Sequence, residues 1–140
     1  MLLNSYFIES HSLIVEIING EVTLDSLIEL RLLEIERGWI RPGVNSLGIF
    51  HRISTAITHS EVLAFAEWTK TNLTALAGSK TALIVDTPIT TAFSQIVASN
   101  VSDIRAMRTF STLSSAANWL GVPVQSILEA VPEAGDFNRK

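Results

Sequence analysis

The segment of residues 46–86 limits the fold of this chain more than any other stretch. It begins with a short apolar run at residues 46–50 and ends with a second one at residues 81–86. Between the two runs, apolar residues recur at helical spacing from residue 62 to residue 76. A strand, a helix and a strand in this order form a crossover unit, which places the two strands side by side and parallel. The sequence therefore predicts an α/β fold built on parallel strands.

Residues 51–58 are predicted to form the loop between the first strand and this helix. Two helix starts compete at the end of the loop, because Ser60 is a good N-cap and Thr58 can form a capping box with Glu61. Gly78 is predicted to end the helix.

The N-terminal part of the chain predicts an antiparallel hairpin and a helix. Residues 6–9 and 13–18 have the composition of two strands joined by a short turn. The Asn-Gly pair at residues 19–20 is then expected to turn the chain, and Thr23 to cap a helix that Gly38 ends. The predicted buried face of this helix comprises Leu24, Leu27, Ile28, Leu32 and Ile35.

Three residues do not fit that face. Leu30 and Leu33 fall among charged residues on its far side, where they are either ordinary surface leucines or part of a strip that contacts a partner. Arg31 lies within the apolar face, and we expect its aliphatic stem to cover apolar surface while its charged end reaches water.

A third helix is predicted after the strand at residues 81–86. Thr87 is suited to cap it, and Pro88 to occupy its first position. Its predicted buried face comprises Ile89, Ala92, Phe93, Ile96 and Val97, and its predicted outer face comprises Thr90, Thr91, Ser94, Gln95, Ala98 and Ser99. Since this outer face carries no charge, it either packs on a second subunit around Thr91 and Gln95 or is a weakly polar surface.

The C-terminal part predicts one more strand and two short helices. Residues 104–110 alternate in polarity and carry basic residues, as edge strands do. Ser111 or Thr112 is predicted to begin a helix that Gly121 closes, and Pro123 to open the last helix.

Length and composition place the chain among folded globular proteins. Its 140 residues suit a single domain, expected over residues 1–131, followed by a polar, frayed tail at residues 132–140. The apolar fraction of 47% and the charged fraction of 17% exclude a disordered chain and a coiled coil. No apolar run approaches the ~20 residues that span a bilayer, no signal peptide is recognisable and cysteine is absent, so we expect a cytoplasmic protein. The net charge of −4 argues against a general nucleic-acid binder.

The order hairpin, helix, strand, helix, strand, helix, strand, helix resembles that of the SpoIIAA-like (STAS-like) proteins of bacteria. The run Arg-Thr-Phe-Ser-Thr at residues 108–112, followed by Ala-Ala-Asn-Trp-Leu-Gly at residues 116–121, is similar to the end of many small uncharacterised members. The likeness covers roughly residues 5–122. It implies a mixed sheet of four or five strands with an N-terminal antiparallel hairpin, β-α repeats and helices mostly on one side.

The better known relatives in this family, the anti-anti-sigma factors, are switched by phosphorylation of a Ser in an Asp-Ser-Ser/Thr-Gly motif where the second helix begins. In the matching region, residues 57–61, Ser60 stands near the right place but the Asp and the Gly are missing. Glu61 would also repel an added phosphate, so an ordinary N-cap is the preferred interpretation of Ser60. Those relatives usually end the preceding strand with Asp, where this chain has His51.

A ligand site is expected beyond the carboxyl ends of the parallel strands, where open sheets of this class bind their ligands. The residues predicted to meet there are His51, Arg52, His59, Ser60, Asp86 and Thr87. Two helices begin near this edge, and helix N-termini favour an anion. The two histidines lack metal-ligand spacing and a third ligand, so neither a metal site nor a cofactor is predicted.

Two functions fit these observations. The first is a non-catalytic interaction or regulatory module that binds a protein partner, or a second copy of itself as a homodimer, through Leu30, Leu33, Thr91 and Gln95. The second is a carrier or sensor of a small apolar or anionic ligand, either lipid-like or nucleotide-like. Hydrolase chemistry ranks last because no Gly-x-Ser-x-Gly elbow surrounds Ser60, so the chain is not predicted to be an enzyme.

Overall fold

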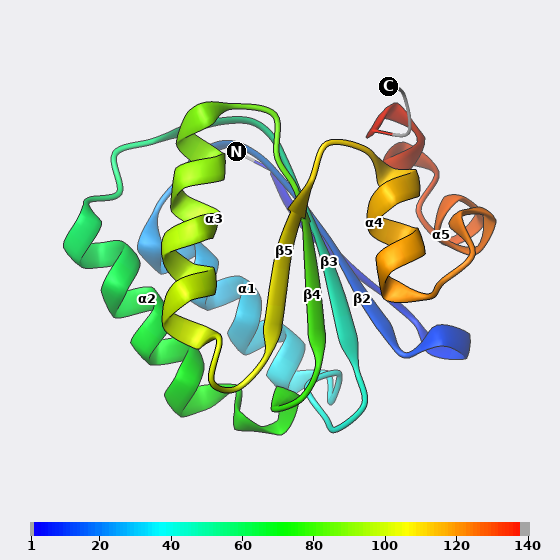
Figure 1. The fold of residues 1–140 in the computed structure, drawn as a ribbon, viewed down its shortest axis with the longest axis horizontal. Helices are drawn as coiled ribbons and strands as arrows, with labels where there is room; N and C mark the ends of the chain where they lie inside the picture. The colour runs from blue at the N-terminus through cyan, green and yellow to red at the C-terminus, as the bar shows by residue number, and fades with distance from the viewer. Residues whose placement is uncertain (1, 138–140) are drawn as a thin grey trace.

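The computed structural model describes residues 2–137 and consists of strands that mostly alternate with helices (Figure 1). The strands are β1 (Leu2–Ile8), β2 (Leu13–Val22), β3 (Asn45–Thr55), β4 (Lys80–Ile84) and β5 (Ala106–Phe110). The helices in the described part are α1 (Leu24–Glu36), α2 (His59–Asn72), α3 (Pro88–Val101), α4 (Leu113–Leu120) and α5 (Val124–Ala130). Three short 3-10 helices are η1 (Glu9–His11), η2 (Thr74–Leu76) and η3 (Pro132–Phe137).

The five strands form one mixed sheet in the order β1-β2-β3-β4-β5. β1 runs antiparallel to β2, and every later neighbour is parallel. Ile49 of β3 pairs with Ile84 of β4, so the predicted parallel crossover unit at the centre of the chain is confirmed. The predicted N-terminal hairpin and the edge position of the last strand are confirmed as well.

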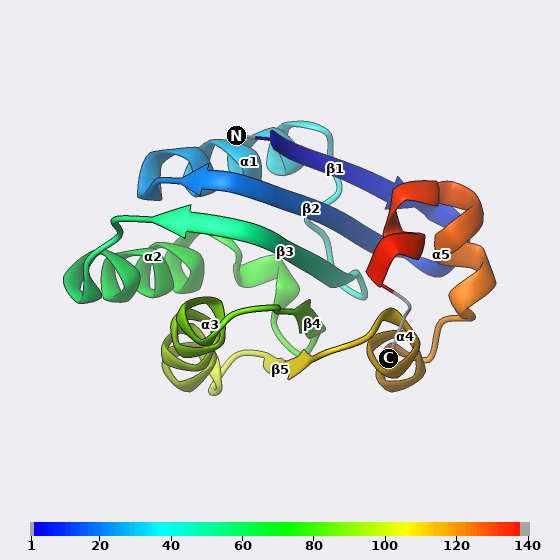
Figure 2. The ribbon, with the colours of Figure 1, turned by 90° about the horizontal axis from the view of Figure 1, so that it is seen from above.

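Helices cover both faces of the sheet, with α1, α2 and α3 on one face and α4 and α5 on the other (Figure 2). The alternation of side chains along each strand divides the core accordingly. Leu47 and Ile49 of β3 pack in the cluster that contains α4 and α5, whereas Phe50 and Leu83 pack in the cluster beneath α1, α2 and α3. The face beneath α1, α2 and α3 is called the inner face below.

β3 is longer than predicted, because β2 does not turn at Asn19 and Gly20. β2 continues to Val22, and β3 pairs with it as far as Thr55. The register shifts between Asn19 and Gly20, where Arg52 of β3 is left out of the pairing with a φ of 51°. The prediction of a loop from residue 51 was therefore wrong, and the Asn-Gly pair belongs to a bulge rather than to a turn.

The predicted buried face of α1 was wrong. Leu30 is only 5% exposed, whereas Leu32 is 49% and Ile35 is 38% exposed. The helix is turned so that Arg31 and Glu34 point under it toward the sheet, with side chains 12% and 1% exposed. Since a stripe assigned by polarity excludes charged residues, Glu34 was not expected beneath the helix. The rotation of the helix also buries Leu30, so the interface prediction for Leu30 fails.

α3 shows the same kind of correction. Thr90 and Ser94, both predicted to face outward, are buried against the sheet. Thr91 is half-buried and Gln95 is exposed, so these two remain on the outer side of the helix. Ala92 is exposed rather than buried, and the side chain of Ile89 lies outside the described residues.

The C-terminal segment at residues 132–137 is packed rather than frayed. Ala134 is fully buried in the same cluster as α4 and α5. Tyr6 Oη donates a hydrogen bond of 2.9 Å to Glu133 Oε2 and so joins this segment to β1. Residues 132–137 of the predicted polar tail are therefore packed, and the rest of that tail, residues 138–140, lies outside the described residues.

Thr58, and not Ser60, caps α2. Thr58 Oγ1 accepts a hydrogen bond from the backbone N–H of Glu61 at 3.2 Å, and Glu61 Oε1 accepts one from the N–H of Thr58 at 3.0 Å. Ser60 is the second residue of the helix. The helix ends at Asn72 and is followed by η2, so Gly78 does not close it.

Replacement of the capping residue tests this helix start. We expect Thr58→Ala to lower the free energy of unfolding by about 1 kcal/mol, because it removes a partner from an orphan N–H of the first turn. Ser60→Ala is the matched control and should change it by less than about 0.5 kcal/mol. Urea unfolding measures both values. If Ser60→Ala lowers the free energy of unfolding as much as Thr58→Ala or more, Ser60 and not Thr58 caps the helix.

Candidate functional site

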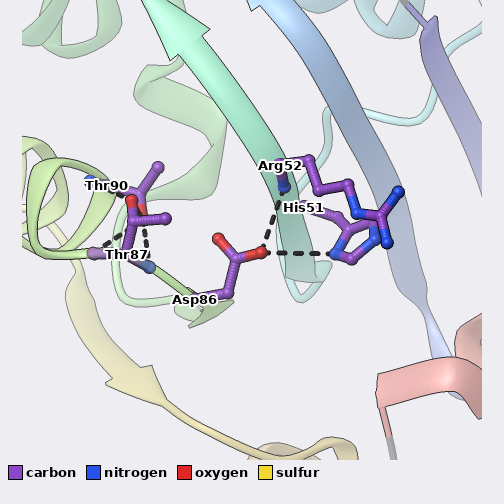
Figure 3. Close-up of polar contacts among 5 residues, drawn as sticks. All are labelled: His51, Arg52, Asp86, Thr87 and Thr90. Carbon is purple, nitrogen blue, oxygen red and sulfur yellow. Dashed lines mark hydrogen bonds and ion pairs between the residues drawn. The ribbon is translucent and has the colours of Figure 1, made fainter.

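The bulge within β3 and the carboxyl end of β4 bring four of the six predicted ligand residues together (Figure 3). Asp86 Oδ2 accepts a hydrogen bond from the backbone N–H of Arg52 at 3.0 Å and lies 3.3 Å from His51 Nδ1. The side chain of Arg52 points away from Asp86 (Figure 3). Asp86 thus satisfies the N–H group of the bulged residue, which explains how Arg52 is held at a positive φ.

Thr87 begins α3 beside this group. Its Oγ1 accepts a hydrogen bond from the N–H of Thr90 at 3.2 Å, and Thr90 Oγ1 accepts one from the N–H of Thr87 at 3.3 Å. A shallow, open depression of about 530 Å³ lies alongside, lined by Asp86, Thr87, Gln95 and Ser111 among others. Because the cap already uses one N–H of the first turn and Asp86 adds a negative charge, this edge is poorly suited to an anion.

His59 and Ser60 do not join this group. Both lie in the first turn of α2, where Ser60 Oγ is 3.2 Å from Thr58 Oγ1. Figures 1 and 2 both show the start of α2 well apart from the start of α3. The long β3 strand carries the chain away from the sheet before α2 begins, so the six residues do not converge on one ligand.

A second polar group, not predicted as a site, lies buried on the inner face of the sheet. It consists of Glu16 on β2, Arg31 and Glu34 on α1, and Arg105 just before β5. Glu16 stands between Ile14 and Ile18 on the strand and points in the same direction. We call these four residues the charged cluster.

Within the charged cluster, Arg31 lies near the carboxyl groups of both glutamates. Its Nη1 atom forms an ion pair with Glu16 Oε2 and lies 4.0 Å from Glu34 Oε1. Its guanidinium also sits 5.9 Å from the centre of the Phe65 ring of α2. The expected snorkelling of Arg31 to the solvent is therefore wrong, because its charged end turns inward to Glu16.

Arg105 has no comparable partner. It is 7% exposed, and no carboxylate oxygen in residues 2–137 lies within 4.0 Å of its guanidinium nitrogens. Its Nε atom is buried without a hydrogen bond, as are Glu34 Oε2 and the Oγ atom of Ser94 on α3. Buried polar atoms are nearly always paired, so three unpaired ones in one place call for an explanation.

These three atoms belong to residues that line one internal cavity. The cavity has about 30 Å³ of space for the centres of water-sized groups, enough for a few such groups. Its walls also include Ser46 and Thr81, whose hydroxyl oxygens are 2.9 Å apart. The cavity is therefore polar on the side of the sheet and of α1.

Gly48 of β3 leaves room beside the charged cluster. It pairs with Glu16 on one side and with Leu83 on the other, and all three positions face inward. A Cβ atom at position 48 would lie 2.8 Å from Leu83 Cδ2 and 3.8 Å from Glu16 Oε1. A Cβ atom at position 48 would thus crowd the side chain of Leu83 and would only touch that of Glu16.

Burial and neighbouring charges change the titration of the charged cluster. Burial, together with the charge of Glu16 and hydrogen bonding to it, raises the pKa of Glu34 from its ordinary 4.5 to about 10, although Arg31 and Arg105 oppose this. Burial and the positive charge of Arg31 lower the pKa of Arg105 to about 10. At pH 7 Glu34 is then neutral, and two guanidinium groups face the single carboxylate of Glu16.

An apolar pocket adjoins this cavity along the inner face. Its walls include Ile18, Val22 and Leu27, and it shares Phe50 and Phe93 with the cavity. The two rings meet edge to face with centres 6.2 Å apart. A polar compartment and an apolar one thus lie end to end between the sheet and the helices.

Two signals in the sequence pointed to this site. Glu16 interrupts the apolar strand at residues 13–18 at a position that faces the same way as Ile14 and Ile18. Arg31 was recognised as a charge within an apolar stripe. Arg105 and Ser94 carry no such signal, because only the packing of α3 against the sheet brings them to the cavity.

Comparison of the chain with protein-family models, with curated proteins and with solved structures finds no match. In the described residues, no three His, Asp or Glu side chains are placed to hold a metal ion. None of the helices described there is both long and apolar enough to cross a membrane.

The buried Glu34 makes stability depend on pH. A folded-state pKa above the unfolded value means that protonated Glu34 stabilises the fold below pH 4.5, and this contribution is lost as the pH rises toward 10. Glu34→Gln stays neutral, so at pH 8 we expect it to be more stable than the wild type by on the order of 1–3 kcal/mol, with a smaller difference near pH 4.5.

Urea unfolding at several pH values measures this difference. The matched control is Glu29→Gln on the exposed side of the same helix, which should stay within about 0.5 kcal/mol of the wild type throughout. A difference between Glu34→Gln and the wild type that does not grow with pH would contradict a neutral Glu34.

Proposed function

We propose that this protein is a non-catalytic ligand-binding module, a carrier or sensor whose ligand occupies the cavity under α1, α2 and α3. The observation that carries the proposal is the buried, unpaired Arg105 facing the same cavity as the unpaired Ser94 Oγ and Glu34 Oε2. An unpaired buried charge is strongly unfavourable, and a bound ligand that pairs with it removes that penalty. A fold that needs only stability would be better served by apolar residues at these positions.

We propose a STAS-like architecture for the module. The N-terminal hairpin, the mixed sheet and the succession of strands and helices support this assignment. The C-terminal signature also has a structural role, since Trp119 of α4 packs on Phe110 of β5 with ring centres 5.7 Å apart. Architecture alone says little about activity, so the ligand-binding proposal depends on the cavity and not on the family.

Filling the cavity tests the proposal. Native mass spectrometry of the wild type, purified from its own host, should show a small bound molecule. Ser94→Leu places an apolar side chain in the cavity and should abolish the added mass, at a stability cost of about 1–3 kcal/mol. Ser99→Leu, on the exposed side of the same helix, is the matched control and should retain it.

Two results would count against ligand binding in the cavity. One is a wild-type spectrum with only the mass of the chain, together with an unchanged melting temperature across a panel of lipids and nucleotides. The other is an added mass that Ser94→Leu retains.

A second candidate function is self-association through the outer side of α1. Leu32, Leu33 and Ile35 are exposed large apolar residues on this helix, and Leu63 is another on the adjacent α2. Of the four residues predicted to form an interface, Leu33 keeps this role at 37% exposure, whereas Leu30 is buried. Exposed apolar side chains gathered on one helix are typical of protein–protein contacts.

Charges on this face test self-association. If α1 forms a homodimer interface, the double variant Leu32→Glu/Leu33→Glu should reduce the mass measured by light scattering from that of a dimer to that of a monomer. Gln95→Glu on α3 is the control and should leave the mass unchanged. A wild type that is monomeric at all concentrations excludes the homodimer.

A further inference from the structure

We propose that the ligand is an amphiphile with one negative charge, whose anionic group pairs with Arg105 and whose apolar part lies in the adjoining apolar pocket. This inference rests on the proposed ligand-binding function and adds the chemical class of the ligand. Four features of the inner face lead to it: the unpaired guanidinium, the balance of charge, the position of the apolar pocket and the narrowness of both compartments.

Arg105 defines the anionic end. A guanidinium is charged at every physiological pH, and it pairs best with a planar carboxylate or similar oxyanion. Ser94 Oγ, which lines the same cavity, can donate a hydrogen bond to the same anion. Glu16 cannot serve as this anion, because its Oε2 atom is already paired with Arg31.

The balance of charge sets the number of negative charges. Arg31 and Arg105 bring two positive charges to the cavity, and the ion-paired Glu16 brings one negative charge. Arg31 is paired with Glu16, whereas no carboxylate oxygen of the described residues lies within 4.0 Å of Arg105. One negative charge on the ligand then pairs with Arg105, whereas a doubly charged phosphate would leave a buried excess.

The apolar pocket defines the other end. It continues from Phe50 and Phe93 toward the ends of β2 and β3, where Ile53 and Ile57 are half-buried. None of the residues that line this pocket is charged, whereas the lining of the cavity includes all four residues of the charged cluster. A ligand that occupies both compartments would have its apolar part at Ile53 and Ile57 and its anionic end at Arg105.

The dimensions favour a slim chain over a ring system. The apolar pocket has about 20 Å³ for the centres of water-sized groups, and the cavity about 30 Å³. Ligand pockets for drug-sized molecules are roughly 300–1,000 Å³, so a nucleotide does not fit the space present. An alkyl carboxylate, which has one planar anionic group and an apolar chain without rings, is the simplest ligand of this class.

Sodium octanoate is the probe for this inference. Isothermal titration calorimetry should show that the wild type binds octanoate at least tenfold more tightly than 1-octanol, octylammonium, octyl phosphate or acetate. Octanol tests whether the ligand needs a charge, and octylammonium tests whether that charge must be negative. Octyl phosphate tests whether a second negative charge weakens binding, and acetate tests whether the alkyl chain is needed.

Three variants locate the two ends of the ligand. Arg105→Gln should weaken octanoate binding at least tenfold and leave octanol binding unchanged. Arg108→Gln, at an exposed arginine of β5, is the matched control and should bind octanoate like the wild type. Ile53→Trp should narrow the entrance and weaken octanoate binding as well.

Folding of each variant is checked by circular dichroism and thermal unfolding. If Arg105→Gln does not fold, Ser94→Ala takes its place, because it removes only one hydroxyl, and it should weaken octanoate binding about threefold to tenfold.

The inference is overturned if octanoate binds no better than octanol, or if Arg105→Gln and Ser94→Ala bind octanoate like the wild type. It is also overturned if the mass found on the protein from its own host belongs to a neutral or cationic compound. In that last case the proposed ligand-binding function stands and only the chemical class of the ligand is wrong. If the wild type neither binds octanoate nor carries an added mass, both the ligand-binding function and the proposed class of ligand are wrong.

Discussion

The ion pair between Glu16 and Arg31 determines how the first helix lies on the sheet. Both side chains are buried, so each requires the other, and their meeting fixes the rotation of α1 about its axis. This rotation brings Leu30 and Glu34 beneath the helix and leaves Leu32 and Ile35 outside. The apolar outer side of α1 and the polar cavity under it are thus two results of the same contact.

The inner face is therefore unlike the opposite face of the same sheet. Under α4 and α5 the core is a continuous apolar cluster that includes Leu47, Ile49 and Leu113. Under α1, α2 and α3 the apolar packing is interrupted by the four ionisable side chains of the charged cluster and by a cavity. Apolar burial, the dominant favourable term in folding, is present on both faces, and the charged cluster is an addition to it on the inner face.

The order of elements and the parallel pairing of β3 with β4 followed from patterns within short stretches of sequence. The Thr87-Pro88 start of α3 and the Gly121 end of α4 were predicted for the same reason, because caps depend on adjacent residues. Residues that depend on distant contacts were not predicted correctly. Arg31 meets Glu16 only after α1 has packed on β2, and the loop predicted at His51 is a strand only because β2 runs on beside it.

The apolar face under α4 and α5 has a consequence for synthesis on the ribosome. The segments that carry Val15, Ile49 and Ile84 are synthesised before residues 113–134, which cover these side chains. Until residues 113–134 dock, this face of the sheet exposes apolar side chains to water, as aggregation-prone folding intermediates do. The rate at which these residues dock thus sets how long each new molecule exposes that surface.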